Sequence, residues 1–229
     1  MNLAALFSGG KDSTFSIYKA QQLGHQVVCL ITIMPQSAES HLLHHPNIGT
    51  TALQAESMNI PQLIIASNTE ETQKETELIK SALIEAKTKY SIKGIVHGGI
   101  LSEFQRSKFE SVAKELELDV IAPIWRSDQK QYMHQLVDLG FEFIITSVSC
   151  DGLDSSWLGK KITKTNIAEL EYLSEKYHFN LSFEGGEAET FVLNCPLFRW
   201  PIALEKTRSS WDGYRGTIEI LQAKLEKYC

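Results

Sequence analysis

Cysteine is scarce in this sequence. The chain of 229 residues has four cysteines, and no two of them have the Cys-x-x-Cys spacing. That spacing is typical of structural zinc sites, and regularly placed cysteines are typical of disulfide frameworks. We therefore expect neither, and we interpret Cys29 and Cys150 as small buried apolar residues.

Long apolar runs are also missing. No stretch approaches the roughly 18 apolar residues of a membrane-spanning helix. The first apolar run, Leu3 to Phe7, is short and has no basic segment before it, although a signal peptide needs both features. These absences predict a cytoplasmic protein with no membrane partner.

A basic surplus is absent as well. The sequence has 22 Lys and Arg against 28 Asp and Glu, a formal net charge of −6. Proteins that bind duplex nucleic acid usually carry excess positive charge. The charge therefore argues against DNA as a partner and disfavours tRNA as a substrate.

What is present is an alternation of short apolar runs and helical patterns. We expect strands at 3–7, 27–33, 62–66, 94–99, 120–124 and 141–148, and helices at 13–23, 50–59, 70–90, 102–118, 128–139 and 163–177. This order predicts an α/β fold with a doubly wound, mostly parallel sheet. Ligands of such sheets bind beyond the carboxyl ends of the strands.

The C-terminal segment differs. Residues 201–208 and 216–227 are typical of two strands joined by a turn, and a shift in the apolar pattern near residue 220 predicts a β-bulge. We expect a nucleotide-binding domain over residues 1–150. A smaller C-terminal α+β part over residues 151–229 would face the substrate and end in this hairpin.

The stretch SGGKDS, Ser8 to Ser13, follows the first strand and opens the first helix. It is no Walker A loop, because Gly10-Lys11 is followed by Asp12 rather than Ser or Thr. Glycines and a helix N-terminus nevertheless suit an anion, since they present backbone N–H groups. The alternative is a turn that caps the helix through Asp12 or Ser13.

This hexapeptide resembles the pyrophosphate loop of the ATP pyrophosphatase (PP-loop) superfamily. Segments 44–61, 98–125, 152–160 and 184–198 together resemble the diphthine–ammonia ligase family, archaeal type. The resemblance implies an adenine nucleotide alpha hydrolase-like fold and a ligase that forms a C–N bond. It also implies ATP and Mg²⁺ as cofactors, ammonium as nitrogen donor, and translation elongation factor 2 as protein substrate. Diphthine on that factor would become diphthamide through an acyl-adenylate, with release of AMP and pyrophosphate.

The ATP site is expected at the loop and the neighbouring strand ends. Lys11 and Asp12 are candidate catalytic residues, and we expect both side chains to face solvent. Adenosine is expected near residues 31–33 and Gly98. The predicted nucleotide-binding residues are Ser8, Gly9, Gly10, Lys11, Asp12, Ser13, Ile31, Thr32, Ile33, Gly98 and Gly99.

The acceptor site is expected where acidic residues gather. Three glutamates in EGGEAET would repel one another unless a cation binds among them, and ammonium, Mg²⁺ or the trimethylammonium group of diphthine would serve. We predict that Glu187 and Glu189 are catalytic and serve the acceptor or its ammonia rather than ATP. The predicted substrate-binding residues are Glu103, Gln105, Arg106, Asp154, Glu184, Gly185, Gly186, Glu187, Glu189 and Thr190.

Two other functions stay open at this stage. The chain could be another adenylating enzyme, such as a tRNA sulfur transferase, or a nucleotide-binding protein without turnover. His41, His44 and His45 match no standard zinc spacing, so we predict no protein-held metal there. They are interpreted as either an acceptor-facing loop or plain surface, and a homo-oligomer is possible.

Overall fold

A computed structural model describes residues 1–35, 47–67 and 72–227; the side chains of Pro35, Ile48, Thr72, Phe104 and Gln105 lie outside this description. Two sheets make up this part of the chain. The first is fully parallel, in the order β3-β2-β1-β4-β5. Its strands are β1 (Asn2–Leu6), β2 (Gln26–Pro35), β3 (Gln62–Ser67), β4 (Gly94–Val96) and β5 (Asp119–Ile121).

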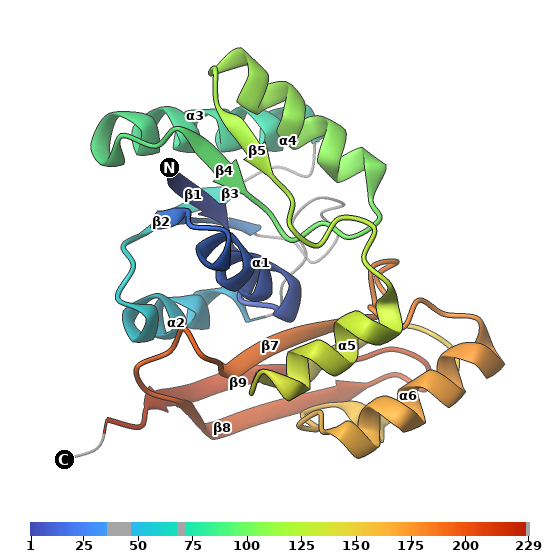
Figure 1. The fold of residues 1–229 in the computed structure, drawn as a ribbon. Helices are drawn as coiled ribbons and strands as arrows, with labels where there is room; N and C mark the ends of the chain where they lie inside the picture. Colours follow the sequence, from blue (N-terminus) through green and yellow to red (C-terminus); the bar gives the residue numbers. More distant parts are fainter. Residues whose placement is uncertain (36–46, 68–71, 228–229) are drawn as a thin grey trace.

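Helices cover both faces of this sheet (Figure 1). They are α1 (Lys11–Gln22), α2 (Thr51–Met58), which follows the 3₁₀ turn η1 (Ile48–Thr50), α3 (Thr72–Tyr90) and α4 (Glu103–Glu115). Residues of β1 show how the faces are divided. Ala4 packs in the core under α3 and α4, whereas Leu3 and Ala5 pack with α1 and α2, because side chains alternate along a strand. The doubly wound α/β prediction is confirmed.

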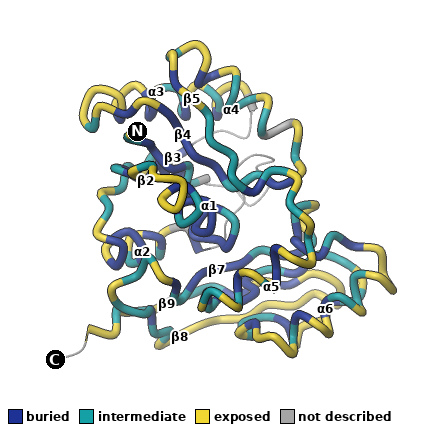
Figure 2. Tube along the Cα trace, in the orientation of Figure 1, coloured by how far each residue is buried: buried dark blue, intermediate teal, exposed yellow. Residues whose placement is uncertain are grey.

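The second sheet is antiparallel, in the order β7-β6-β9-β8. Its strands are β6 (Glu142–Val148), β7 (Ala188–Asn194), β8 (Ile202–Trp211) and β9 (Gly216–Leu225). Helices α5 (Gln129–Asp138) and α6 (Lys164–Tyr177) contribute to its core, and a 3₁₀ turn, η2 (Ser155–Trp157), lies between β6 and α6. Figure 2 shows β8 as largely exposed.

The structure corrects the sequence interpretation of the second sheet. The strand predicted at 141–148 exists as β6, but it pairs antiparallel with β7 and β9 instead of joining the parallel sheet. The two sheets thus divide the chain between β5 and β6, earlier than residue 150. Strand β7 was not predicted. The terminal hairpin and its bulge are confirmed, since the β8–β9 register shifts around residues 220–222.

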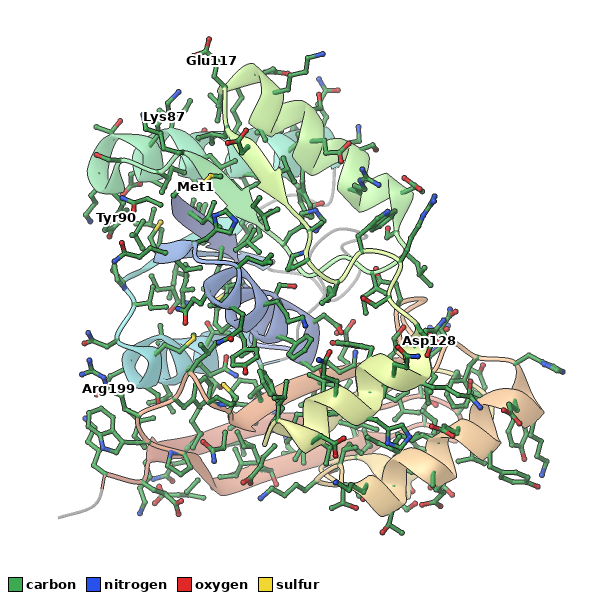
Figure 3. The ribbon with its side chains drawn as sticks, viewed as in Figure 1. Met1, Lys87, Tyr90, Glu117, Asp128 and Arg199 are labelled. Carbon is green, nitrogen blue, oxygen red and sulfur yellow. The ribbon has the colours of Figure 1, made fainter. Side chains whose placement is uncertain are left out.

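Helix α1 lies between the two sheets (Figure 1). Phe15 packs against Tyr132 of α5 and Phe141, with ring centroids 5.5 and 5.3 Å away. The carboxyl ends of the parallel strands point away from Met1, Tyr90 and Glu117 (Figure 3). Within the described residues, no helix has the length and apolar composition needed to cross a membrane.

Candidate functional site

The loop between β1 and α1 has the shape of an anion site. Gly9 has φ +81°, a conformation that favours glycine. Gly10 is the N-cap of α1 and offers no side chain there. The hydroxyl oxygens of Ser8 and Ser13 lie 3.1 Å apart, and Ser13 Oγ also accepts from the Ser8 N–H at 3.3 Å. The loop therefore presents two serine hydroxyls and a helix N-terminus, which are groups that bind phosphate.

Strand β7 closes this loop from the second sheet. The backbone N–H of Lys11 donates to Thr190 Oγ1 at 3.1 Å, and the N–H of Val192 donates to the Gly9 carbonyl at 3.0 Å. Thr190 was predicted to bind the acceptor; here its buried hydroxyl holds the start of α1. The site is thus built from both sheets, with residues about 180 positions apart in contact.

The expectation that the Lys11 side chain faces solvent is wrong. This side chain is buried, with 1% of the residue exposed, whereas the sequence interpretation placed it in solvent. Its Nζ lies 2.9 Å from both carboxylate oxygens of Asp12 and donates to the Ser182 carbonyl at 2.6 Å. The rings of Tyr132 and Phe183 lie 5.9 and 5.3 Å from Nζ. An unpaired buried ammonium is unfavourable, so Asp12 explains why Lys11 can lie there.

Asp12 is more accessible, with 28% of its side chain exposed. Besides Lys11, it accepts a short hydrogen bond of 2.5 Å from the Tyr132 hydroxyl. Burial and the nearby Asp12 charge raise the Tyr132 pKa well above 10, so Tyr132 is a donor at neutral pH. Tyr132 lies in the helix that the sequence predicts at 128–139. Its position one turn into an amphipathic helix carried no functional signal.

Two glutamates join Asp12 and Lys11 to form the site's charged cluster. Burial raises the pKa of Glu189 to about 8. The Lys11 charge lowers this pKa, and the Asp12 and Glu184 charges raise it. Burial and the Asp12 charge also raise the pKa of Glu184. We name Lys11, Asp12, Glu184 and Glu189 the acidic cluster.

Glu184 also organises the neighbouring loop. Its Oε1 accepts from three consecutive backbone N–H groups, those of Ile100, Leu101 and Ser102, at 3.0 to 3.3 Å. These groups lie just before α4. The carboxylate therefore ties the loop after β4 to the segment that precedes β7.

Glu187 lies in a different environment from the other two glutamates. Its Oε1 accepts from the backbone and side-chain N–H groups of Asn180, at 3.0 and 2.7 Å, and its Oε2 accepts from the Gly185 N–H at 2.7 Å. Gly186 is held by Ser149, whose hydroxyl donates to its carbonyl at 2.5 Å. Glu187 thus braces the 180–187 loop, and a role in catalysis stays a prediction.

Gly98 is required for close packing. A Cβ atom there would lie 2.6 Å from the backbone of Asp12 and Ser13, so the segment after β4 can approach the start of α1 this closely only at a glycine. Gly99 follows, and its N–H donates to His97 Nδ1 at 3.1 Å. His97 is buried, and burial lowers its pKa to about 4.

Ile31, Thr32 and Ile33 are buried. Both isoleucines pack in the core under α3, and Thr32 donates to the Phe7 carbonyl at 2.8 Å. Their side chains thus face the protein rather than a ligand. Strand β1 ends at Leu6, opposite Ile31, while β2 continues to Pro35. A nucleotide at this position would meet backbone groups.

Other predicted acceptor residues lie in the first turns of α4 and beside η2. Glu103 pairs with Arg126 at 3.0 Å, and Arg106 pairs with Glu110 at 2.6 Å while stacking 4.6 Å from the Trp125 ring. The Gln105 side chain lies outside the described residues. The side chain of Asp154 accepts from the Ser156 N–H, which lowers the Asp154 pKa and caps η2.

The part of the chain that the structure describes has no ready-made metal site. No three His, Cys, Asp or Glu residues there are placed to hold an ion. His41, His44 and His45 fall outside the described ranges. Mg²⁺ commonly binds through substrate phosphates and only one or two carboxylates, so the exposed side of Asp12 is compatible with an ion that arrives with ATP.

Comparison with known proteins identifies relatives along the whole chain. Residues 1–120 match the family described as diphthamide synthase N-terminal domain, and residues 128–225 match the diphthamide synthase C-terminal domain. A mouse protein named diphthine–ammonia ligase is 34% identical, over 99% of this chain and 91% of its own length. The human protein of that name is 33% identical, over 90% and 84%.

A solved structure was also found, described as a predicted subunit of tRNA methyltransferase from Methanocaldococcus jannaschii. It is 17% identical, covers 86% of this chain and 98% of its own, and has a TM-score of 0.44.

Proposed function

Because the chain belongs to the diphthamide synthase family, we propose that it converts diphthine on translation elongation factor 2 to diphthamide, using ATP and ammonium. Family membership supports the reaction class, since relatives that match nearly the whole chain are named diphthine–ammonia ligase. The observation that carries the mechanism is the loop at residues 8–13, with Gly9 at φ +81° and Gly10 as an N-cap of α1 that has no side-chain cap.

The reaction has two steps. A carboxylate oxygen of diphthine attacks the α-phosphorus of ATP, and the bond from that phosphorus to the bridging oxygen breaks, which gives an acyl-adenylate and pyrophosphate. Ammonia then attacks the acyl carbon, a C–N bond forms and AMP leaves. Such chemistry depends mainly on positioning and on stabilising developing charge.

The loop would receive the leaving pyrophosphate. Backbone N–H groups and the positive end of α1 face that position, and the hydroxyls of Ser8 and Ser13 lie beside it. Lys11 belongs to the same loop, and its Nζ is bonded to Asp12 and to the Ser182 carbonyl. Mg²⁺ would enter with ATP and neutralise its phosphate charge, with Asp12 as the nearest carboxylate in the loop. Adenosine would lie against the backbone of residues 31–33.

The acidic cluster would serve the nitrogen donor. Ammonium must lose a proton before it can attack, and a buried carboxyl with a pKa near 8 exchanges protons close to neutral pH. We assign Glu189 that role. Glu187 would instead hold the 180–187 loop in place for the acceptor, because its oxygens are already bonded to Asn180 and Gly185.

Mass spectrometry of the elongation factor tests the function. Incubation with ATP and ammonium should lower the mass of diphthine-bearing factor by about 1 Da, as exchange of OH for NH₂ requires, and ATP should become AMP and pyrophosphate. Factor without diphthine is the matched control and should stay unchanged. ADP as product, or AMP without a change in the factor's mass, would contradict the assignment.

A further inference from the structure

Gln54 of α2 joins the phosphate loop to the second sheet. The residue is fully buried, and its Nε2 donates to the carbonyl oxygens of Gly9, at 2.9 Å, and Val192, at 2.8 Å. The Gly9 oxygen also accepts from the Val192 N–H at 3.0 Å. Two donors from outside the loop therefore hold one loop carbonyl.

The peptide between Gly9 and Gly10 is the part of the loop that turns over most easily. Glycine adopts both signs of φ at little cost, and two glycines flank this peptide. Its rotation would exchange the positions of the Gly9 carbonyl and the Gly10 N–H. An N–H attracts a phosphate, whereas a carbonyl oxygen repels one, so the orientation of this peptide matters for anion binding.

Gly9 and Gln54 also fit one another sterically. A Cβ atom on Gly9 would lie 2.4 Å from Gln54 Oε1 and 2.9 Å from Thr51 Cγ2. Gln54 Oε1 has no hydrogen-bond partner within the described residues. Its link to the loop is therefore made by the Nε2 donor.

We propose that Gln54 is a positioning residue for the phosphate loop, which fixes the Gly9–Gly10 peptide with its carbonyl toward the second sheet and its N–H toward the leaving pyrophosphate. This inference rests on the proposed function, because it requires the loop to bind ATP. Gln54 acts through the Gly9 carbonyl and contacts neither ATP nor the acceptor.

The proposal separates two kinetic constants. If the loop peptide flips in a variant, only a fraction of free enzyme binds ATP, and the apparent dissociation constant rises by the inverse of that fraction. Saturating ATP then restores the competent form. Gln54→Met, which lacks both donors, should raise KM for ATP about tenfold or more while kcat changes much less. A purely structural role would lower the active fraction, and thus kcat, with KM unchanged.

Gln54→Glu adds a pH signature. A protonated carboxyl can still donate one hydrogen bond to a carbonyl, whereas the ionised form cannot. Burial raises the pKa of such a carboxyl. The KM for ATP, divided by the wild-type KM at the same pH, should be smallest at low pH and rise with pH. The division removes the titration of Glu189 and other native groups.

Asn47→Asp is the matched control. Asn47 is another buried amide that joins the first part of the chain to the second sheet, through the Ile218 carbonyl at 2.9 Å and the Ile220 N–H at 2.7 Å. Neither of these two hydrogen bonds involves the phosphate loop. Its substitution should lower the melting temperature and leave KM for ATP unchanged at each pH.

Wild type, Gln54→Met, Gln54→Glu and Asn47→Asp are assayed together for AMP release and melting temperature. Wild type that releases no AMP would overturn the proposed function itself. An active wild type together with a KM for ATP within about twofold of wild type, in Gln54→Met and in Gln54→Glu at every pH, would overturn the positioning role. If Gln54→Met melts below the assay temperature, the rise of the Gln54→Glu KM ratio with pH still carries the test.

Discussion

Lys11 is the residue whose environment differs most from its sequence-based expectation. Basic residues in a glycine-rich loop are usually taken as solvent-facing phosphate contacts, yet this one is enclosed by Asp12, Ser182 and two aromatic rings. Its charge therefore contributes to the fold as well as to the proposed chemistry. A substitution here should change both stability and turnover.

Lys11→Met tests this double role. We expect turnover to be lost and the free energy of unfolding to fall by about 1.5–3 kcal/mol, the range for hydrogen bonds to charged groups. Thermal melts and AMP release measure the two effects. Lys19→Met is the control, because Lys19 lies on the same helix over the Phe15 ring and outside the loop. A Lys11→Met protein as stable as wild type would contradict the stabilising role of the Lys11–Asp12 ion pair.

Glu189 gives a prediction about pH. Its folded-state pKa of about 8 exceeds the ordinary 4.5, so the folded protein holds this proton more tightly than the unfolded chain. Its contribution to stability is complete below pH 4.5 and is lost as pH rises to about 8. Glu189→Gln cannot ionise, so its stability relative to wild type should increase over that interval.

Melting temperatures of wild type and Glu189→Gln across this interval measure the effect. Glu85→Gln, an exposed glutamate on α3, is the control and should show no such trend. A constant difference between Glu189→Gln and wild type at every pH would show that burial does not shift this carboxyl.

At the scale of elements, the sequence predicted the local structures and missed some of their partners. Strand β1, the loop at 8–13 and α1 follow from an apolar run, two glycines and a helical pattern, all of them local signals. Strand β7 has the sequence AETFVLN, with one acidic residue and a short apolar run, Phe191 to Leu193, so no period-2 pattern marks it. Its contacts with Gly9 and Lys11 are long-range and leave no local trace in the sequence.

The candidate site was predicted to a similar extent. The loop, Glu184 and Glu189 were identified by residue type, and the structure brings them together. Glu187 was grouped with them because of its position in the sequence, but it precedes β7, and its carboxylate accepts hydrogen bonds from Asn180 and Gly185 within the loop. The roles of Tyr132 and Gln54 were missed, because nothing in the sequence distinguishes a buried polar side chain that bonds to the site from other helix residues.

The junction of β4 and α1 supplies the element-scale prediction. Gly98→Ala places a methyl group 2.6 Å from the α1 backbone, which cannot yield as a side chain does. We expect a loss of about 1–3 kcal/mol in stability, as for overpacked cores, and weaker ATP binding, measured by denaturant unfolding and by titration. Gly49→Ala is the control, since nothing lies near its Cβ position. Unchanged ATP affinity in Gly98→Ala would contradict the expectation that this contact positions the ATP site.

At the scale of the whole molecule, α1 and the phosphate loop connect the two sheets. We expect both sheets to unfold in one transition, because neither keeps its contacts without the other. Trp157 packs in the core of the second sheet and Trp211 lies in β8, whereas Trp125 stacks on Arg106 of α4 and the Trp200 backbone bonds to Ser57 of α2. Tryptophan fluorescence therefore reports on the second sheet and on its contacts with the first part, while far-ultraviolet circular dichroism reports on both sheets. The two melting curves should coincide, and ATP should shift both upward. A fluorescence transition that precedes the other would contradict this coupling.

The bond between Gly9 and Val192 also orders events during synthesis. The loop leaves the ribosome some 180 residues before its partner strand. At 5–20 residues per second, that interval is about 10–35 s. Until β7 emerges, the nascent chain therefore lacks one side of the proposed nucleotide site, and premature termination before β7 should leave a fragment that consumes no ATP.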